Sequence, residues 1–489
     1  MKLSSFLLLN WLLLAWNANN LAPKEVTISG KVNAGTLKEV IYTIPHRGIF
    51  HWVLKASAPV DAQGNFQIKI PCEQTSIVAI GGSDQTKKTL ILSPGEHYTL
   101  SLGAEKDEDF FEAKGPNEAG QKLFHALPNP GFVQAAARKY FKDTVISEIK
   151  SKIAAEKAKD LEPFSALLKA KKITPAFFEL VKADRDCYYA TMQAQIVWVK
   201  LLRTDPDKIK SFSPVYQSWF AETMKEYPIN NKSLTRSFWW QEYADTYQGV
   251  SMFLDKDFDP KQLEAHYKNE TIHTFKMKDA PKRFSGEFLE YFQFSYLYSA
   301  CLQKEYEKEL IALVEQFKQQ YPQSPFTKYL QPLVDPIVEY HQAQAAGFSD
   351  QYKFVENYAD LNSLEEALQS FKGKKLYIDV WATWCGPCKA EFAHKEGLKK
   401  LLAEKGYDIL YISIDEPERE EAWKGMIKYY KLEGNHLRTN KDFTNDLVKI
   451  FDQGGSLSIP WYLIVNEEGE IVTTKAKRPS NLKGLEGQL

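Results

Sequence analysis

The alternation of hydrophobic and polar residues changes its period twice along the chain and predicts three structural regions. Residues 23–103 hold short runs with period two, such as Val26–Val32, Asn65–Ile70 and Tyr98–Leu102, punctuated by Gly and Pro clusters. This pattern is typical of an antiparallel β-sandwich. The charged stretch 104–117 that follows is interpreted as a linker.

The second region, residues 118–346, has the period of amphipathic helices. Apolar residues recur there at spacings of three and four, with charged residues between them. The clearest predicted helices are Asp143–Lys159, Thr174–Leu202 and Glu287–Tyr321. The prolines expected to separate such helices include Pro281, Pro332 and Pro336. This region is predicted to be an all-α middle domain, and no known catalytic motif falls within it.

The third region, residues 350–489, alternates strand-like and helix-like segments and predicts a mixed α/β domain in the order β-α-β-α-β-β. The predicted strands are Lys375–Trp381, Tyr407–Asp415, Trp461–Val465 and Glu470–Thr474. The predicted helices are Lys389–Lys405, Glu418–Tyr430 and Phe443–Phe451.

The first residues have the pattern of a targeting segment. Lys2 precedes the apolar stretch Leu3–Trp16, which is shorter than the ~20 residues a membrane span needs but suits a secretory signal. A buried helix is the alternative, and the polar residues Asn17–Asn20 argue against it. Residues 1–22 are therefore predicted to be a signal peptide or membrane anchor, which would place the protein in the cell envelope or periplasm.

Composition narrows the functional classes. The 489 residues are 44% hydrophobic and carry a formal net charge of −1, so charge gives no reason to expect a nucleic-acid partner. With only five cysteines, structural disulfides are not expected to hold the fold together. The odd number leaves at least one thiol unpaired. Cys187 and Cys301 are expected in the core, whereas Cys72 is not assigned.

The segment Trp381–Glu391 carries the candidate chemistry. It reads W-A-T-W-C-G-P-C-K-A-E and joins a predicted strand to a predicted helix. Gly386 and Pro387 suit a first helical turn, so Cys385 would face unpaired N–H groups that favour a thiolate. Cys385 is the predicted nucleophile and Cys388 the resolving thiol. Half of a zinc site is the alternative, but no second ligand pair accompanies it, and no metal or cofactor is expected.

The residues Asp379–Lys389 resemble the active-site segment of thioredoxins, and residues 350–489 resemble the exported thioredoxin-like family of the TlpA/ResA type. The β-domain and helical region ahead of them are similar in layout to Bacteroidota envelope proteins. The resemblance implies a thioredoxin fold and a redox-active Cys385–Cys388 disulfide. It implies disulfide-containing envelope proteins and a membrane thiol-electron donor as partners, and the family includes proteins of cytochrome c-type biogenesis.

The resemblance also implies roles for residues outside the cysteine pair. Asp379 would be a buried acid with a raised pKa that relays a proton for Cys388; a solvated, outward-facing Asp379 is the alternative. Ile459 would present its backbone to a peptide, next to a cis bond at Pro460, while Trp381 would serve packing. The predicted substrate-binding residues are Trp384, Gly386, Pro387, Ile459 and Pro460.

The chain also departs from the family pattern. The segment from Glu418 to Asn440 looks like an insertion typical of the exported branch. Only Ser480–Leu489 remain for the last helix. His394 and His436 are interpreted as helix-surface or loop residues rather than acid–base groups.

These observations together predict an exported thiol–disulfide oxidoreductase that acts mainly as a reductase. The Gly-Pro pair between the cysteines, which resembles that of reducing thioredoxins, supports this direction. Two alternatives remain: a peroxiredoxin-like antioxidant enzyme, and a binding or scaffold protein with an auxiliary redox domain.

Overall fold

A computed structural model describes residues 24–489 except 33–36, 83–87, 104–110, 206–211, 345–346 and 452–456. The predicted signal segment 1–22 lies outside these residues. The chain forms two compact units. The first holds the described residues up to Ala265 together with Asp279–Phe292, and the second holds His266–Lys278 with Gln293–Leu489. Among the described residues, no helix combines the length and apolar character that a membrane span requires.

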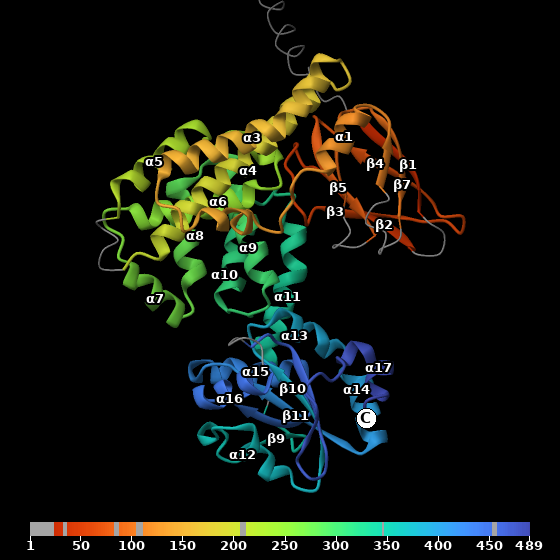
Figure 1. Ribbon diagram of the computed structural model, residues 1–489, viewed down its shortest axis with the longest axis vertical. Helices are drawn as coiled ribbons and strands as arrows, with labels where there is room; N and C mark the ends of the chain where they lie inside the picture. The colour runs from red at the N-terminus through yellow and green to blue at the C-terminus, as the bar shows by residue number, and fades with distance from the viewer. Residues whose placement is uncertain are drawn as a thin grey trace, which may run out of the picture. The chain divides into compact units, whose positions relative to one another are not determined.

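The N-terminal region of the first unit contains two four-stranded sheets, ordered β4-β1-β7-β8 and β3-β2-β5-β6 (Figure 1). The strands are β1 (Glu25–Val32), β2 (Glu39–Thr43), β3 (Lys55–Pro59), β4 (Asn65–Pro71), β5 (Ser76–Gly81), β6 (Lys88–Leu92), β7 (His97–Leu102) and β8 (Phe111–Lys114). Buried residues from both sheets, such as Ile28 and Val78, share one hydrophobic core. Strands that alternate, such as β4, and strands that are buried on both faces, such as β5, both supply side chains to the core between the two packed sheets.

Two details of this region differ from the sequence prediction. The strands β1 and β7 pair in parallel, whereas the other pairings within these two sheets are antiparallel. Residues predicted to lie in a linker form β8, which pairs with β7 so that Thr99 faces Lys114. The two-residue alternation of apolar and polar residues is the same whether a strand pairs in parallel or antiparallel and whichever strand it pairs with. The sequence pattern therefore did not reveal these pairings.

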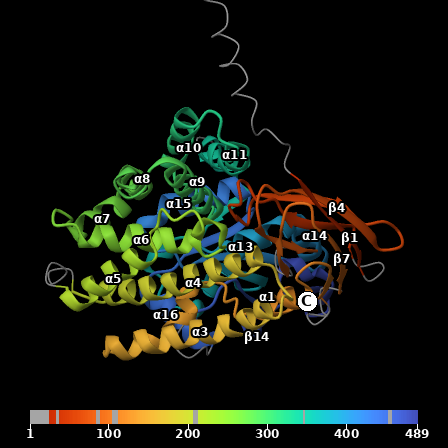
Figure 2. The same cartoon turned by 90° about the horizontal axis from the view of Figure 1, so that it is seen from above.

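The middle of the chain is helical, as predicted. Its helices are α1 (Glu118–His125), α2 (Val133–Ala137), α3 (Ile146–Lys169), α4 (Pro175–Leu202), α5 (Pro214–Glu226), α6 (Trp240–Leu254), α7 (Pro260–Lys268), α8 (Ile272–Arg283), α9 (Gly286–Leu302), α10 (Glu309–Gln320) and α11 (Thr327–Gln344). The hydroxyl of Thr174 caps α4 by accepting the N–H of Phe177 at 3.2 Å, and Pro175 occupies the first turn. Helices α3 and α4 lie side by side (Figures 1 and 2).

Two helical predictions are wrong in detail. The predicted helix Glu287–Tyr321 is two helices, α9 and α10, with a break over 303–308. Pro281, Pro332 and Pro336 lie inside α8 and α11 rather than between helices. Tertiary packing outweighs the local cost of proline in these helices.

The C-terminal domain is built on a six-stranded sheet in the order β14-β13-β10-β11-β12-β9. The strands are β9 (Tyr352–Phe354), β10 (Lys375–Trp381), β11 (Tyr407–Ser413), β12 (Gly434–Arg438), β13 (Trp461–Val465) and β14 (Ile471–Thr473). The helices are α12 (Leu364–Leu368), α13 (Gly386–Glu391), α14 (Lys395–Lys405), α15 (Glu420–Tyr430), α16 (Lys441–Phe451) and α17 (Leu482–Glu486).

Helices cover both faces of this sheet, so most residues of its central strands are buried. One core joins Ile378 and Ile412 of the sheet to residues of α12 and α16, and the other joins Tyr377 and Ile464 to residues of α14 and α17. In Figure 1, α14 and α17 lie to the right of β10 and β11, and α16 lies to the left. This arrangement confirms the predicted mixed α/β domain.

The predicted strand order omitted two strands. The segment interpreted as an insertion ends in β12, which pairs in parallel with β11 and with β9. The helix predicted from Lys389 begins at Gly386 and is divided into α13, a 3₁₀ turn over Phe392–His394, and α14. The last helix, α17, has five residues, in keeping with the short C-terminal segment.

Candidate active site

The strand β10 delivers the cysteine motif to one end of the sheet. Residues Leu376–Trp381 are buried, and β10 pairs in parallel with β11 and antiparallel with β13. The chain leaves the strand after Trp381 and begins α13 at Gly386, with Cys385 as the N-cap residue. The motif therefore lies where a central strand turns into a helix.

The two cysteines form a disulfide in which Cys385 also caps the helix. Their sulfurs are 1.90 Å apart and their Cα atoms 5.3 Å apart. The Cys385 sulfur accepts a hydrogen bond of 3.1 Å from the backbone N–H of Cys388. Cys385 is 4% exposed and Cys388 is 1% exposed. The same N–H would stabilise negative charge on Cys385 after reduction.

Asp379 lies within β10 and is 2% exposed. Its neighbours across the sheet are Tyr411 and Tyr462, and its Oδ1 has no hydrogen-bond partner among the described residues. Burial, with a smaller contribution from the charge of Glu391, raises the pKa of Asp379 well above its usual value. Asp379 is therefore a buried carboxyl, and the solvated alternative is wrong.

The Ile459–Pro460 peptide bond is cis and precedes the strand β13. Because Trp461 pairs with Val380, Ile459 and Pro460 lie beyond the end of β10 at which the cysteine loop begins. Pro460 is buried and Ile459 is half-buried. The register thus brings two distant segments to the same end of the sheet.

The two tryptophans of the motif occupy opposite environments. Trp384 is 48% exposed, whereas Trp381 is fully buried and packs edge-on against Phe392 at 5.2 Å between ring centroids. Gly386 and Pro387 are exposed beside the cysteines. The exposed members form the part of the site that another molecule can contact.

The Redoxin family model matches residues 353–489. This part of the chain is a Redoxin domain. The thiol-disulfide oxidoreductase ResA of Bacillus thuringiensis subsp. konkukian (strain 97-27) is 28% identical over 113 residues, which are 23% of this chain and 61% of the relative. The ResA of Bacillus thuringiensis (strain Al Hakam) is 34% identical over 113 residues, which again are 23% of this chain and 61% of the relative.

Among solved structures, the chain is similar to the thioredoxin domain of a thiol-disulfide oxidoreductase from Bacteroides vulgatus. The identity is 28%, the match covers 24% of this chain and 79% of that one, and the TM-score is 0.21. The chain spans 61% of the length of the first curated relative, and the similarity to both kinds of relative is confined to about a quarter of this chain.

Sequence reasoning missed a buried cation in the Redoxin domain. Lys389 follows Cys388 and is 4% exposed. Its ammonium donates hydrogen bonds to the carbonyl oxygens of Thr383 at 2.7 Å, Lys304 at 2.9 Å and Gln303 at 3.1 Å. Burial lowers the pKa of Lys389 to about 8. A lysine after the motif suggests a solvated side chain, and only the fold reveals its partners.

A second missed feature is the network that fixes the loop before Cys385. Asp415 is buried and accepts hydrogen bonds from the backbone N–H of Thr383 at 2.9 Å and from its hydroxyl at 2.7 Å. Ser413 donates to the same carboxylate at 2.7 Å. Arg419 donates to Thr383 Oγ1 at 2.8 Å. These bonds fasten the loop before Cys385 to residues 413–419.

The remaining candidate residues lie apart from this chemistry. His394 is exposed in the 3₁₀ turn that follows α13. His436 is not a loop residue as predicted but lies buried in β12, where it stacks on Tyr411 and its Nε2 lies 2.8 Å from the carbonyl oxygen of Leu432. Burial lowers the pKa of His436 to about 4.

The cysteines outside the motif, Cys72, Cys187 and Cys301, are buried free thiols with raised pKa values.

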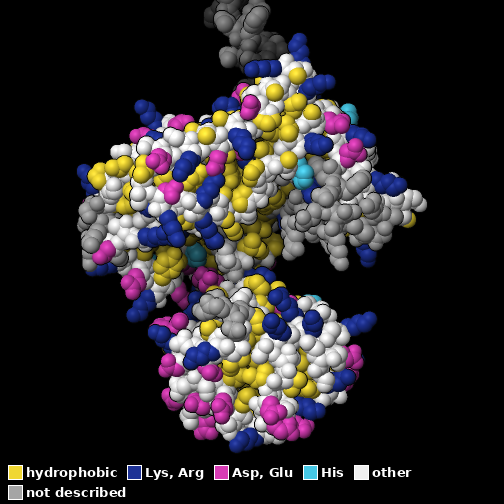
Figure 3. All heavy atoms as spheres, in the orientation of Figure 1, with side chains coloured by type: hydrophobic (Ala, Val, Ile, Leu, Met, Phe, Trp, Pro, Cys, Tyr) yellow, Lys and Arg dark blue, Asp and Glu magenta, His cyan; other side chains and the backbone are white. Residues whose placement is uncertain are grey.

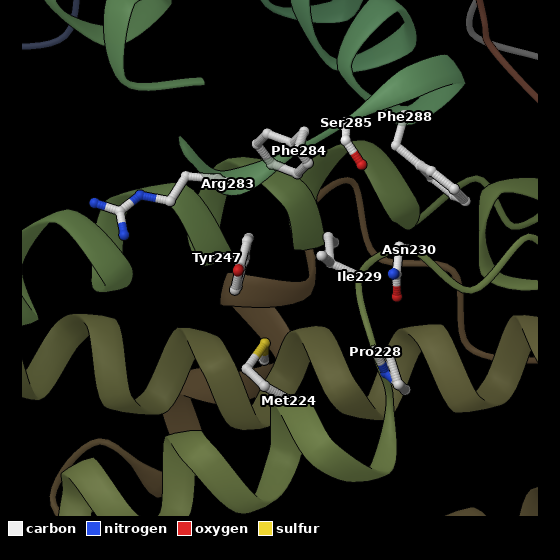
Figure 4. Close-up of a pocket in the computed structure, with 9 residues that line it drawn as sticks. All are labelled: Met224, Pro228, Ile229, Asn230, Tyr247, Arg283, Phe284, Ser285 and Phe288. Carbon is white, nitrogen blue, oxygen red and sulfur yellow. The ribbon is translucent and has the colours of Figure 1, made fainter. Parts of the chain in front are cut away.

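The first unit contains a cavity of about 250 Å³ among its helices. Met224 and Tyr247 project toward this space, and Arg283 lies at one end (Figure 4). The guanidinium of Arg283 is engaged by Asp279 at 3.1 Å and by Asp255 at 3.2 Å. Its charge is thus already paired, and the cavity presents no acid–base pair. We therefore place the chemistry at the dithiol.

Proposed function

We propose that the chain is an exported thiol–disulfide oxidoreductase that reduces disulfides of envelope proteins through Cys385 and Cys388. The observation that carries this proposal is the hydrogen bond from the Cys388 N–H to the Cys385 sulfur at the start of α13. A sulfur in that position is stabilised as a thiolate, the form that attacks disulfides. The similarity of the Redoxin domain to proteins named thiol-disulfide oxidoreductases supports the same reaction.

In the proposed reaction, the Cys385 thiolate attacks one sulfur of a substrate disulfide. A mixed disulfide forms, and the other substrate sulfur leaves as a thiolate. The Cys388 thiolate then attacks the Cys385 sulfur, which forms the Cys385–Cys388 disulfide and releases the second substrate thiolate. Two electrons pass to the substrate, whose two thiolates take up protons.

Asp379 is proposed to handle the proton of Cys388 in the second step. Cys388 is almost fully buried, so its thiol cannot easily lose a proton to water. The ionised form of a carboxyl with a raised pKa inside the same domain can accept that proton. The transfer is favoured because the pKa of the Asp379 carboxyl is then closer to that of the Cys388 thiol. Asp379 acts on a protein sulfur rather than on the substrate.

The substrate is proposed to be an extended peptide segment that contains a disulfide. Ile459 offers backbone groups beside the cis-proline, and Trp384 offers an exposed aromatic face near the cysteines. Acidic and basic side chains are interspersed over the visible face of the Redoxin domain (Figure 3). Recognition through backbone and apolar contacts is consistent with that mixed surface.

The decisive experiment is a reduction assay with a protein disulfide, combined with a titration of the Cys385–Cys388 couple against glutathione. We expect reductase activity and a potential near the ~−270 mV of thioredoxin. A potential above about −150 mV would overturn the reducing direction, since the couple would then oxidise rather than reduce most partners. Peroxide consumption that exceeds disulfide reduction would favour the peroxidase alternative.

Partners and location are proposed from the same chemistry. An exported dithiol must be re-reduced by a thiol-electron donor in the membrane, and the apolar segment Leu3–Trp16 supports export. A Cys388→Ser variant expressed in the native cell should retain envelope proteins as mixed disulfides with Cys385. The absence of any such adduct, together with an unchanged phenotype of Cys385→Ser, would favour the scaffold alternative.

A further inference from the structure

The connection between α9 and α10 packs against the cysteine motif. It provides two of the three carbonyl groups that hold the Lys389 ammonium, those of Gln303 and Lys304, while Thr383 of the motif provides the third. All four residues belong to the second unit. Because the three oxygens lie within 3.1 Å of one nitrogen, the Lys389 side chain joins the connection to the loop before Cys385.

The connection has a specific backbone shape. Lys304 and Tyr306 adopt left-handed conformations, with φ of 55° and 61°, which non-glycine residues seldom occupy. Such backbone is retained where surrounding contacts hold it. Here Glu305 pairs with Arg419 at 3.3 Å, and the Tyr306 hydroxyl lies 2.6 Å from that of Tyr430. Both of these partners belong to the Redoxin domain.

Lys389 is also close to both cysteines in the sequence. Lys389 follows Cys388 directly, and the Thr383 carbonyl that it binds lies two residues before Cys385. The charged groups that influence the pKa of the Lys389 ammonium are Glu305, Glu307, Arg419 and Lys304. Those groups carry two negative and two positive charges, so the positive charge of Lys389 is not cancelled by its surroundings.

We propose that Lys389 is a positioning residue that fastens the loop presenting Cys385 to the α9–α10 connection, and that its charge stabilises the Cys385 thiolate. The α9–α10 connection, which belongs to the same unit as the cysteine motif, is then part of the redox site. This inference rests on the proposed function and deepens it. It assigns a role in thiolate formation to residues outside the cysteine motif.

The charge is tested with Lys389→Met in the full chain carrying Cys388→Ser, by following the pH dependence of Cys385 alkylation. Methionine keeps the unbranched shape and most of the length of the side chain but loses the charge and the three hydrogen bonds. We expect the Cys385 thiolate pKa to rise by about one pH unit or more. Lys400→Met, at an exposed lysine of α14, is the matched control. A rise no larger than that of the control would overturn the role of the charge.

The fastening is tested at Lys304, whose backbone carbonyl accepts a hydrogen bond from Lys389. Lys304→Pro cannot adopt the left-handed conformation and removes the N–H that donates to the Cys301 carbonyl at 3.2 Å. Lys304→Gly accepts that conformation. We expect the proline variant to raise the Cys385 thiolate pKa and to speed amide exchange over residues 382–385, and the glycine variant to do neither. A folded proline variant with unchanged exchange and thiolate pKa would overturn the fastening.

If Lys304→Pro does not fold, Lys304→Val replaces it, because a β-branched residue is strongly disfavoured at positive φ. Alkylation of Cys385 requires no substrate and no turnover. The inference can therefore fail while disulfide reduction is observed, and the proposed function can fail while Lys389 still shifts the thiolate pKa.

Discussion

Arg419 donates a hydrogen bond of 2.8 Å to the hydroxyl of Thr383, two residues before the cysteine that we propose as the nucleophile. The same arginine pairs with Glu305 at 3.3 Å and lies 3.7 Å from the buried carboxylate of Asp415. One guanidinium therefore links three segments around the cysteine loop.

Replacing Arg419 by Ala should destabilise the second unit by about 1–3 kcal/mol, because the buried Asp415 loses a nearby positive charge and Thr383 loses a donor. Thermal unfolding measures the loss. Arg419→Lys keeps the positive charge but lacks the planar guanidinium, so this variant should be more stable than Arg419→Ala but less stable than the wild type. A melting temperature of Arg419→Ala equal to that of the wild type would show that the network does not contribute to stability.

Asp379→Asn should stabilise the fold and impair the reaction. An ionised Asp379 is disfavoured in the folded state, since burial raises its pKa. The unfolded chain loses that proton at lower pH than the folded chain, so stability is lost as pH rises above the unfolded value. Asparagine removes this penalty, which we expect to amount to about 1–3 kcal/mol near pH 7.

The same Asp379→Asn variant should slow the release of the mixed disulfide, because no carboxyl is left to accept the proton of Cys388. Single-turnover reaction with a model disulfide separates the two steps. Formation of the mixed disulfide should be unchanged in rate and its resolution slowed about tenfold or more. Equal resolution rates in variant and wild type would contradict the proton-relay role.

Trp384 and Trp381 should respond to alanine in opposite ways. Trp384 is exposed, so Trp384→Ala should raise KM for a protein disulfide about tenfold with little change in melting temperature. Trp381 is fully buried, so Trp381→Ala should cost about 3–5 kcal/mol of stability. Steady-state kinetics and thermal unfolding of the pair distinguish substrate contact from packing.

Acid should destabilise the second unit through His436, whose pKa is about 4 in the folded chain against an ordinary value of 6.5. Between these values the unfolded chain binds the proton and the folded chain does not. Stability therefore falls as the pH drops from about 6.5 to about 4, by about 3 kcal/mol in total.

His436→Gln should reduce this acid sensitivity, because glutamine can still donate to the Leu432 carbonyl but does not titrate. The measurement is the difference in melting temperature between pH 7 and pH 5 for wild type and variant. His394→Gln, at an exposed histidine, is the matched control. An unchanged difference in His436→Gln would exclude His436 as the source.

The sequence predicted two of the central strands to the residue and a third with a late end, since β11 ends at Ser413 rather than at Asp415. The strands β10 and β13 have the predicted bounds, because buried central strands are apolar on both faces. The strand β12, Gly-Asn-His-Leu-Arg, was missed because its polar residues hide a strand whose last three positions are buried. The cysteine motif could likewise be located from local sequence, since its chemistry depends on spacing and on a helix start.

The parts that could not be predicted depend on contacts between distant segments. The break between α9 and α10 contains no Gly or Pro, so the left-handed Lys304 and Tyr306 leave no local signal. Burial of Lys389 depends on carbonyl groups more than 80 positions earlier in the chain. Long-range hydrogen bonds of this kind have no periodic pattern.

The division into two units has a practical consequence for protein engineering. The chain passes between the units after Ala265, after Lys278 and after Phe292. A fragment that starts at Gln293 would lack His266–Lys278, in which His273 contacts Tyr296 at 2.8 Å. Conversely, a fragment that ends at Ala265 would lack Tyr291, whose hydroxyl donates to the Phe50 carbonyl at 2.6 Å. No single cut yields both halves intact, so expression of either unit alone calls for a grafted or circularly permuted chain.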